Sequence, residues 1–254
     1  MDTSSLNTFV NELFTQSGDI IKPYFYNRDY SVDQKSDESP VTRADKEAEA
    51  CIRSLIQKEF PHHGVIGEEF GEENAGSEYT WIIDPIDGTK AFITGSPLFT
   101  TLIGLLKNGE PIFGGIHQPV AGLRCIGDNT ETTLNGSVVR CRETSSIEKA
   151  TILSTSIKTP DQYQDGDKFT ALAKRARLFR TWADGFGYLL VASGQADAML
   201  DPIMNPWDVL PVIPVVRGAG ASISNWQGNT NHWESCVAAS PTLFDSIIQA
   251  LNDA

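Results

Sequence analysis

Residues 81–90 read Trp-Ile-Ile-Asp-Pro-Ile-Asp-Gly-Thr-Lys, and this stretch decides how the rest of the chain is interpreted. An apolar run typical of a strand leads into Asp84, and a proline and a tight turn then carry a second acid, Asp87. Gly88 lets the backbone approach a ligand closely. If a helix begins near Asp87, its first amides form an anion site beside two carboxylates. Acids and an anion site belong together when a cation bridges them, so the stretch predicts Mg²⁺ and a phosphate.

Two further acids stand where a strand ends or a helix begins. Glu68 follows a short apolar run, and Asp208 lies in a predicted helix start in which Asn205 is the N-cap and Pro206 the first helical residue. Each acid also has an ordinary explanation, as a solvated surface glutamate or as a favourable charge at a helix N-terminus. Asp87 could likewise be a plain N-cap. Together, however, the three segments predict one shared cluster of carboxylates.

The first half of the chain combines helical and strand-like patterns. Apolar spacing predicts amphipathic helices over 6–21 and 42–60, separated by an exposed polar loop over 33–40. Strand-like runs follow at 64–67, 79–83, 99–106, 111–117 and 123–126, with hairpin turns at 108–109 and 135–136. The pattern predicts two helices beside an antiparallel sheet.

The second half alternates strands with helices, which is typical of an α/β arrangement. The expected strands are 151–153, 198–200, 221–223 and 236–238, and the expected helices are 167–177, 184–194, 206–218 and 241–252. We therefore divide the chain into a metal-binding catalytic half, 1–148, and a substrate-specificity half, 149–254. With no linker between them, the halves are expected to pack as one unit.

Composition restricts the function. The net charge of −13 and the pI of about 4.7 argue against binding to nucleic acid or to an anionic membrane, since both need a basic face. The chain begins without the features of a signal peptide, and no apolar run is long enough to span a membrane, so the expected location is the cytoplasm. The four cysteines are widely spaced and are expected to be reduced thiols.

The Gly-Glu-Glu turn at 67–69, the 81–89 core and the Pro-Trp-Asp at 206–208 resemble the motifs of the inositol monophosphatase superfamily of Mg²⁺-dependent phosphatases. The resemblance covers nearly the whole chain. It implies an α/β fold, with an α+β N-terminal half and an α/β C-terminal half layered as an αβαβα sandwich. It also implies two or three Mg²⁺ per site, hydrolysis of a small phosphate ester by a metal-activated water, and a homodimer.

Roles are carried over by the resemblance alone. The implied metal ligands are Glu68, Asp84, the Ile86 carbonyl, Asp87 and Asp208. The implied catalytic residues are Thr89 and Asp45, which activate the attacking water, and Glu68. The implied substrate-binding residues are Gly88, Thr89, Lys90, Asp184 and Asp201. Lys35 matches a lysine of the loop that closes over the metals, and the sequence leaves the role of Glu234 open.

Several stretches, including 87–95 and 182–188, are similar to the histidinol-phosphate phosphatase branch of the superfamily. Asp184 and Asp201 stand where inositol phosphatases carry a small residue and a glutamate, and two acids facing the leaving group favour an amine. The predicted substrate is L-histidinol phosphate. The alternatives are a 3'(2'),5'-bisphosphate nucleotidase, suggested by Lys90, an inositol monophosphatase, and a silent regulatory homologue. Asp184 could instead cap a helix and Asp201 form a turn.

Overall fold

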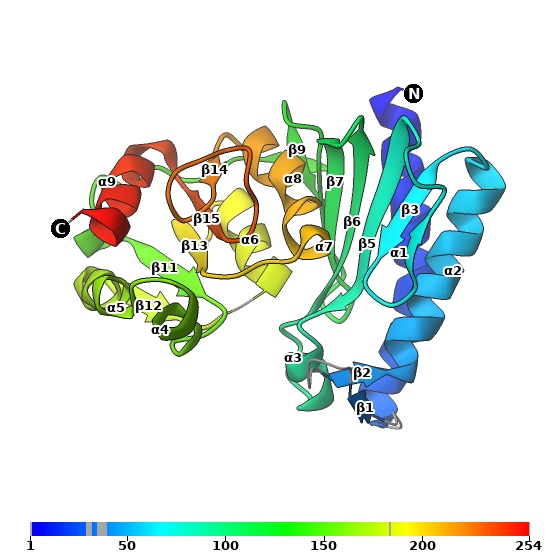
Figure 1. Cartoon of the computed structure of the whole chain (residues 1–254), viewed down its shortest axis with the longest axis horizontal. Helices are drawn as coiled ribbons and strands as arrows, with labels where there is room; N and C mark the ends of the chain where they lie inside the picture. Colours follow the sequence, from blue (N-terminus) through cyan, green and yellow to red (C-terminus); the bar gives the residue numbers. More distant parts are fainter. Residues whose placement is uncertain (1, 29–31, 35–39, 183, 254) are drawn as a thin grey trace.

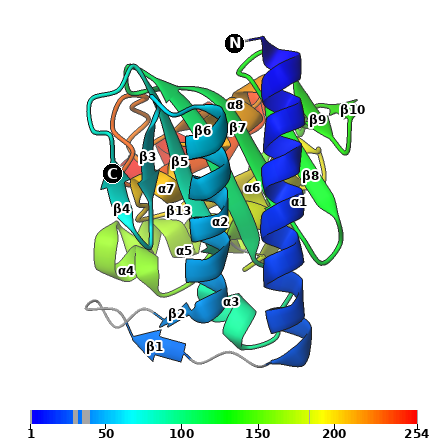
Figure 2. The same cartoon turned by 90° about the vertical axis from the view of Figure 1, so that its right-hand side faces the viewer.

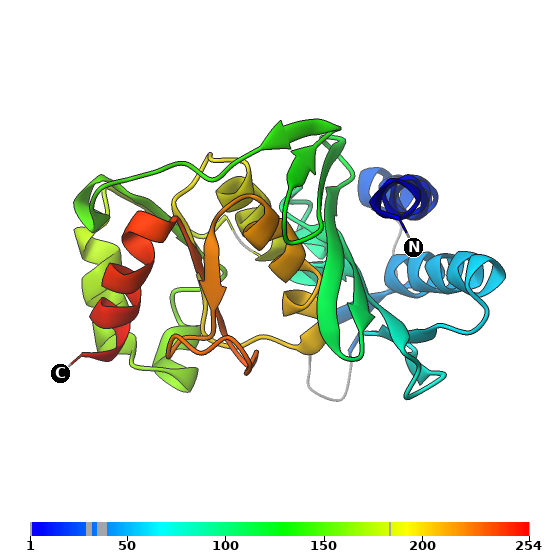
Figure 3. The ribbon, with the colours of Figure 1, turned by 90° about the horizontal axis from the view of Figure 1, so that it is seen from above.

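Five layers of helices and sheets make up the molecule (Figures 1 and 3). The computed structural model describes residues 2–28, 32–34, 40–182 and 184–253. The layers, in order, are an outer helix pair, an eight-stranded sheet, a central helical layer, a five-stranded sheet and a second outer helix pair. The helices in that order are α1 (Thr3–Asn27) and α2 (Arg43–Glu59), then α6 (Asp184–Ala192) and α8 (Val212–Gly218), then α5 (Gly166–Arg175) and α9 (Pro241–Asn252). The predicted αβαβα sandwich is confirmed.

The first two helices lie side by side over one face of the large sheet (Figure 2), as the apolar spacing predicted. Helix α1 buries Val10, Leu13 and Phe14 against this sheet. Helix α2 begins at a capping box, in which the Asp45 carboxylate accepts from the backbone amide of Thr42 at 2.8 Å and from its hydroxyl at 2.5 Å. The box fixes Asp45 at the start of the helix.

The polar segment between these helices is partly different from the prediction. Instead of a loop throughout 33–40, β1 (Val32–Gln34) and β2 (Pro40–Thr42) pair as a short antiparallel ladder. Lys35 lies outside the described residues, so its predicted position over the metals stays a prediction.

The large sheet has the strand order β10-β9-β8-β7-β6-β5-β3-β4. Neighbouring strands are antiparallel except β3 and β5, which are parallel. The strands are β3 (Gly64–Gly67), β4 (Gly71–Glu73), β5 (Tyr79–Asp87), β6 (Thr100–Lys107), β7 (Glu110–Gln118), β8 (Leu123–Gly127), β9 (Thr132–Leu134) and β10 (Ser137–Val139). Both predicted hairpin turns are confirmed, and Asn108 and Asn135 take the positive φ that such turns require. β4 was not predicted.

The prediction was wrong about where the core stretch turns. Strand β5 continues through Asp87 instead of turning directly after Asp84, and helix α3 (Thr89–Ile93) begins two residues after Asp87. The reason is a β-bulge between Asp84 and Asp87, which accommodates Pro85 within the strand. Gly88 is the N-cap of α3 at φ 90°, a left-handed conformation that favours glycine.

The smaller sheet has the order β12-β11-β13-β15-β14 and mixes parallel and antiparallel pairs. The strands are β11 (Thr151–Ser154), β12 (Leu178–Arg180), β13 (Ala198–Asp201), β14 (Ser222–Ser224) and β15 (Cys236–Ala239). β12, the short helix α4 (Thr159–Tyr163) and the 3-10 turn at Ile147–Lys149 were not predicted. The boundary between the two halves at residue 148 stays a prediction, and α8 from the second half packs on β7 of the first.

The helix predicted over 206–218 is two helices, α7 (Pro206–Val209) and α8, separated at Leu210 and Pro211. Proline has no amide hydrogen and collides with the preceding turn, so Pro211 ends one helix and caps the next. The break lies two residues after Asp208.

A row of glycines on the large sheet packs against the residues at this break. Gly104, Gly114 and Gly127 are direct cross-strand partners on β6, β7 and β8. A β-carbon on Gly104 would lie 3.0 Å from Cα of Pro211, and one on Gly127 would lie 2.7 Å from the carbonyl oxygen of Pro214. The start of α8 can therefore approach the sheet only because these strand positions lack side chains.

Candidate metal and phosphate site

The first two acids of the site owe their common direction to a β-bulge. Asp84 pairs with Leu102 and Asp87 with Thr100, so β5 advances three residues while β6 advances two. Residues three apart on a regular strand face opposite sides, and the extra residue of the bulge turns both acids to the same side. Asp84 is further fixed because its Oδ1 accepts the amide of Ile86 at 3.0 Å. Both carboxylates are buried.

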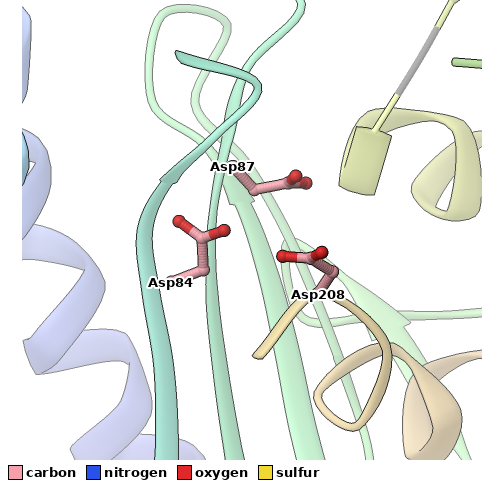
Figure 4. A group of neighbouring side chains, drawn as sticks. All are labelled: Asp84, Asp87 and Asp208. Atoms are coloured by element: carbon pink, nitrogen blue, oxygen red, sulfur yellow. The ribbon is translucent and has the colours of Figure 1, made fainter. Parts of the chain in front are cut away.

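The third acid comes from the short helix α7, more than a hundred residues later in the chain. Asp208 Oδ2 accepts the backbone amide of Asn205 at 2.9 Å and its side-chain amide at 3.1 Å. The predicted helix start, with Asn205 as N-cap and Pro206 first, is confirmed. Carboxylate oxygens of Asp84, Asp87 and Asp208 all lie within 4.8 Å of one another, and Figure 4 shows the three side chains converging.

Such a cluster is electrostatically costly without a cation. Burial, and then the neighbouring charges of Glu68 and Asp87, raises the pKa of Asp84 well above its usual value. Burial likewise raises the pKa of Asp87, with Asp184 and Asp208 adding to the effect. The pKa of Asp208 rises to about 6, again mainly through burial. Three hard oxygen donors that repel one another at this spacing fit a divalent cation of the Mg²⁺ type.

Asp87 is also held by its surroundings in the second half of the chain. Its Oδ2 accepts the Thr100 hydroxyl at 3.1 Å and the backbone amide of Gly185, which belongs to the first turn of α6. This link between the large sheet and the central helical layer was not predicted, because nothing in the sequence pairs residues so far apart.

Glu68 lies at the rim of the three-acid cluster. Its backbone amide donates to the carbonyl oxygen of Ile83 at 3.3 Å, which places its backbone beside β5, one residue before Asp84. Its charge raises the pKa of both Asp84 and Asp208. The side chain lines a cavity of about 660 Å³, which it shares with Gly88, Thr89 and Lys90. Glu68 is thus close enough for its charge to act on the cluster, but the acids whose oxygens lie within 4.8 Å of one another are Asp84, Asp87 and Asp208, so its predicted role as a metal ligand stays a prediction.

The two residues predicted to activate water lie on different elements. The Thr89 hydroxyl donates to the carbonyl oxygen of Ile86 at 3.1 Å, so the predicted catalytic hydroxyl and the predicted carbonyl ligand are in direct contact. Asp45 is fully buried, and its Oδ1 has no hydrogen-bond partner among the described residues. Burial raises its pKa to about 6, and the charge of Glu68 contributes in the same direction.

The two acids assigned to the leaving group line a second, smaller cavity of about 110 Å³ together with Asp87 and Asp208. Asp201 is buried and accepts the Tyr188 hydroxyl at 2.9 Å and the Thr155 amide at 3.1 Å. Asp184 begins α6 at a positive φ of 54°, and a β-carbon on Gly88 would lie 2.8 Å from its Oδ2. Its carboxylate therefore lies against the Gly88 backbone.

Burial, and then the charges of Asp201 and Asp208, raises the pKa of Asp184 to about 7. Burial also raises the pKa of Asp201. Tyr188 and Thr155, which hold these acids, were not predicted, because a tyrosine or threonine in a helix or loop carries no distinctive sequence signal. Glu234 lines a neighbouring hollow of about 360 Å³ with Ile203 and Met204, which also line the smaller cavity.

A family model described as the inositol monophosphatase family matches residues 2–254. The chain belongs to the inositol monophosphatase family. It is 37% identical over 250 residues to the chloroplastic bifunctional phosphatase IMPL2 of Arabidopsis thaliana, covering 96% of this chain and 70% of that protein. It is 36% identical over 245 residues to a histidinol-phosphatase of Chlorobaculum parvum, covering 95% of each. An inositol monophosphatase structure from Zymomonas mobilis matches with a TM-score of 0.86 and 30% identity over 99% of both chains.

The predicted superfamily and its histidinol-phosphatase branch are confirmed by these relatives. As a member of this family the chain is a phosphoric monoester hydrolase, and the family is metal-dependent. The cluster of Asp84, Asp87 and Asp208 is a group of acids able to hold metal. No helix in the described part of the chain has the length and apolar character needed to cross a membrane.

Proposed function

We propose that this chain hydrolyses L-histidinol phosphate to L-histidinol and phosphate with Mg²⁺ as cofactor. The observation that carries the proposal is the acid pair Asp184 and Asp201 beside the three-acid cluster. None of the ion pairs formed among the described residues uses either of them. Asp201 is buried and Asp184 is half-buried, and a carboxylate pair that forms no ion pair in the fold is matched by a ligand that brings its own cation.

The cluster residues are proposed to hold two or three Mg²⁺. Glu68, Asp84 and the Ile86 carbonyl are the proposed ligands of one ion, and Asp84, Asp87 and Asp208 those of a second. Bound ions of this kind lower the pKa of water and neutralise the charge that develops on a phosphate ester and its leaving oxygen. The electrostatic cost of the cluster, with three raised pKa values, supports this assignment.

The chain's own groups are proposed to orient water and phosphate. Gly88, Thr89 and Lys90 line the larger cavity next to the cluster and are the proposed phosphate contacts. The Thr89 hydroxyl, which donates to the Ile86 carbonyl, has lone pairs left to accept a hydrogen bond from the attacking water and so orient it. The unpartnered Oδ1 of Asp45, whose pKa is about 6, is the proposed base of the pair.

The leaving group is proposed to occupy the smaller cavity. An ammonium group within reach of Asp184 and Asp201 would offset their repulsion, since both carboxylates have raised pKa values there. A second phosphate on the substrate would be repelled by the same acids, which argues against a bisphosphate nucleotidase. A neutral polyol such as inositol gains no ionic interaction from the two carboxylates. Inositol 1-phosphate is still included in the test below, because the chain is similar to an inositol monophosphatase.

The test is a comparison of kcat/KM on L-histidinol phosphate, inositol 1-phosphate and adenosine 3',5'-bisphosphate at saturating Mg²⁺. We expect histidinol phosphate to have the highest value. A higher value for either competitor would overturn the substrate assignment and leave the phosphatase activity intact.

A homodimer in the cytoplasm is proposed as the working form, on the resemblance to the family. Light scattering after size-exclusion chromatography tests the first part, and a single species at the 27.8 kDa mass of the chain would contradict it. Fractionation of cells that express the native protein tests the second.

A further inference from the structure

The inner face of α2 carries a second acid one turn after Asp45, and the assigned site does not use it. Glu49 is fully buried, and its side chain points at the β3–β4 hairpin instead of solvent. A buried carboxylate is stable only when it is paired and hydrogen-bonded. Its partners therefore indicate what it is for.

Among the described residues, the hydrogen-bond partners of Glu49 are two backbone amides that follow Glu68 and the side chain of Arg53. Oε2 accepts the Glu69 amide at 2.8 Å, and Oε1 accepts the Phe70 amide at 3.2 Å. Oε1 also accepts Nε of Arg53 at 2.8 Å, one helical turn further along α2. The carboxylate thus binds two consecutive amides directly after the proposed metal ligand.

Arg53 also binds the β3–β4 hairpin, at Gly71. Its guanidinium donates to the carbonyl oxygen of Gly71, lies 3.6 Å from the carboxylate of Glu73 and sits 6.0 Å from the centre of the Phe70 ring. Arg53 is itself buried, at 7% exposure. One ion pair on α2 therefore holds residues 69–71 through backbone atoms.

Glu68 is fixed on its other side by β5, through its amide and the Ile83 carbonyl. The position before it, Gly67, cannot carry a side chain, because a β-carbon there would overlap the Glu49 carboxylate. The backbone around Glu68 is thus held between β5 and the Glu49–Arg53 pair, by hydrogen bonds on both sides.

We propose that Glu49 and Arg53 are positioning residues for the metal site, which they serve by fixing the backbone from which Glu68 reaches the cluster. The same helix presents Asp45 at its first turn, so α2 sets the distance between the proposed base and the proposed ligand. Groups behind a metal ligand orient it, and their loss weakens metal binding without touching the metal. The inference rests on the proposed role of Glu68.

The experiment measures Mg²⁺ binding by calorimetry in the absence of substrate, for the native chain, Glu49→Gln and Arg53→Lys. Glu49→Gln keeps the volume and removes the charge, and we expect the Mg²⁺ Kd to rise by about 10- to 100-fold. Arg53→Lys keeps the charge but loses the planar fork, and we expect a smaller rise in the same direction. The KM for substrate at saturating Mg²⁺ is expected to stay within about twofold of native, because neither residue lines the leaving-group cavity.

A matched control is Asp197→Asn, which removes the charge of another fully buried acid. Asp197 directly precedes β13, at the end of that strand opposite Asp201, and its partners are Arg142, Thr144 and Thr151, none of which belongs to the cluster. We expect this variant to lose stability with an unchanged Mg²⁺ Kd. If Glu49→Gln and Arg53→Lys bind Mg²⁺ like the native chain, the positioning role is overturned. If Glu49→Gln does not fold, Arg53→Lys decides alone.

Glu68→Gln separates this inference from the function on which it rests. Weaker Mg²⁺ binding in Glu68→Gln together with native binding in Glu49→Gln would overturn only the positioning role. Native binding in Glu68→Gln would overturn its role as a ligand, and the positioning role with it.

Discussion

Asp84 and Asp87 lie three residues apart on one strand and yet turn their carboxylates toward the same point (Figure 4). The slip of register between β5 and β6 accounts for this, because it inserts one extra residue between the two acids. Pro85, which cannot donate to a ladder, stands in the bulge, and its carbonyl oxygen accepts the Thr101 hydroxyl at 2.9 Å. The bulge is therefore what brings two of the three clustered acids together.

Removal of one cluster charge is expected to affect activity and stability in opposite directions. Asp84→Asn keeps the oxygen that accepts the Ile86 amide but removes one of the mutually repelling charges. We expect kcat to fall by at least about 100-fold, because changes behind a metal ligand already cost about 10- to 100-fold. The Tm of the metal-free protein should rise, since about 1 kcal/mol corresponds to about 2–4 °C at this size. Calorimetry in EDTA and a phosphate-release assay measure the two effects.

The control for this prediction is Asp197→Asn, at an acid of similar burial that has a cationic partner. Its loss leaves Arg142 without its carboxylate, so the Tm should fall while the metal site stays intact. A fall in Tm for Asp84→Asn would contradict the view that the cluster is strained without metal.

The glycine row predicts that a methyl group far from the acids disturbs the metal site. In Gly114→Ala the new β-carbon would overlap the carbonyl oxygen of Pro211, three residues after Asp208. Overpacking of this kind costs about 1–3 kcal/mol, and relief requires α7 and α8 to move away from the sheet. We therefore expect a lower Tm and a raised Kd for Mg²⁺. Gly218→Ala, which collides with the β9 side of the interface instead, should lower the Tm alone.

Stabilisation by Mg²⁺ is expected to grow as pH rises. Burial raises the pKa of Asp208 and Asp45 from 3.8 to about 6, so in the metal-free protein their contribution to stability is full below about pH 4 and is lost as pH rises through about 6. Mg²⁺ needs the ionised acids, so its binding strengthens over the same range. The gain in Tm on adding Mg²⁺ should be larger at about pH 8 than at about pH 5.

The buried His117 changes the stability of the protein with pH in the opposite direction to these acids. Burial lowers the pKa of His117 to about 3, so its contribution to stability falls as pH drops below its unfolded value of 6.5. His117 lies on β7 against α1, so its effect is common to the metal-free and loaded proteins and cancels in their difference. A gain in Tm that is independent of pH would contradict the prediction.

Local patterns were sufficient to predict most of the architecture. Helices α1 and α2, the hairpins and the alternating second half follow from apolar spacing and turn residues, although α1 extends beyond the predicted 6–21 to Thr3–Asn27. The errors lie where tertiary contacts override local preference. The helix predicted over 206–218 breaks at Pro211, where the glycine row leaves room for the backbone to pack against the sheet. Strand β5 continues past Pro85 because its register with β6 shifts by one residue there.

The site could be predicted only as a set of acids. Residue type and position singled out Glu68, Asp84, Asp87 and Asp208, because the sequence pattern predicts each at a strand end or a helix start. The groups that hold them, such as the Gly185 amide on Asp87 and Glu49 behind Glu68, join segments far apart in the chain. No spacing rule links such pairs, so only the folded structure reveals them.

The charge of Asp184 is expected to select the substrate. Asp184→Asn preserves size and the backbone amide bond to the Thr155 hydroxyl at 3.1 Å, but it removes the charge proposed to face an ammonium group. A hydrogen bond to a charged group contributes about 1.5–3 kcal/mol, so kcat/KM on L-histidinol phosphate should fall by about 10- to 150-fold. On a neutral aryl phosphate the loss should stay within about threefold, because that leaving group has no charge to lose. Asp167→Asn, at an exposed acid on α5, controls for long-range charge and should change neither value. Equal losses on the two substrates in Asp184→Asn would mean that Asp184 supports the start of α6 against Gly88 and takes no part in choosing the alcohol.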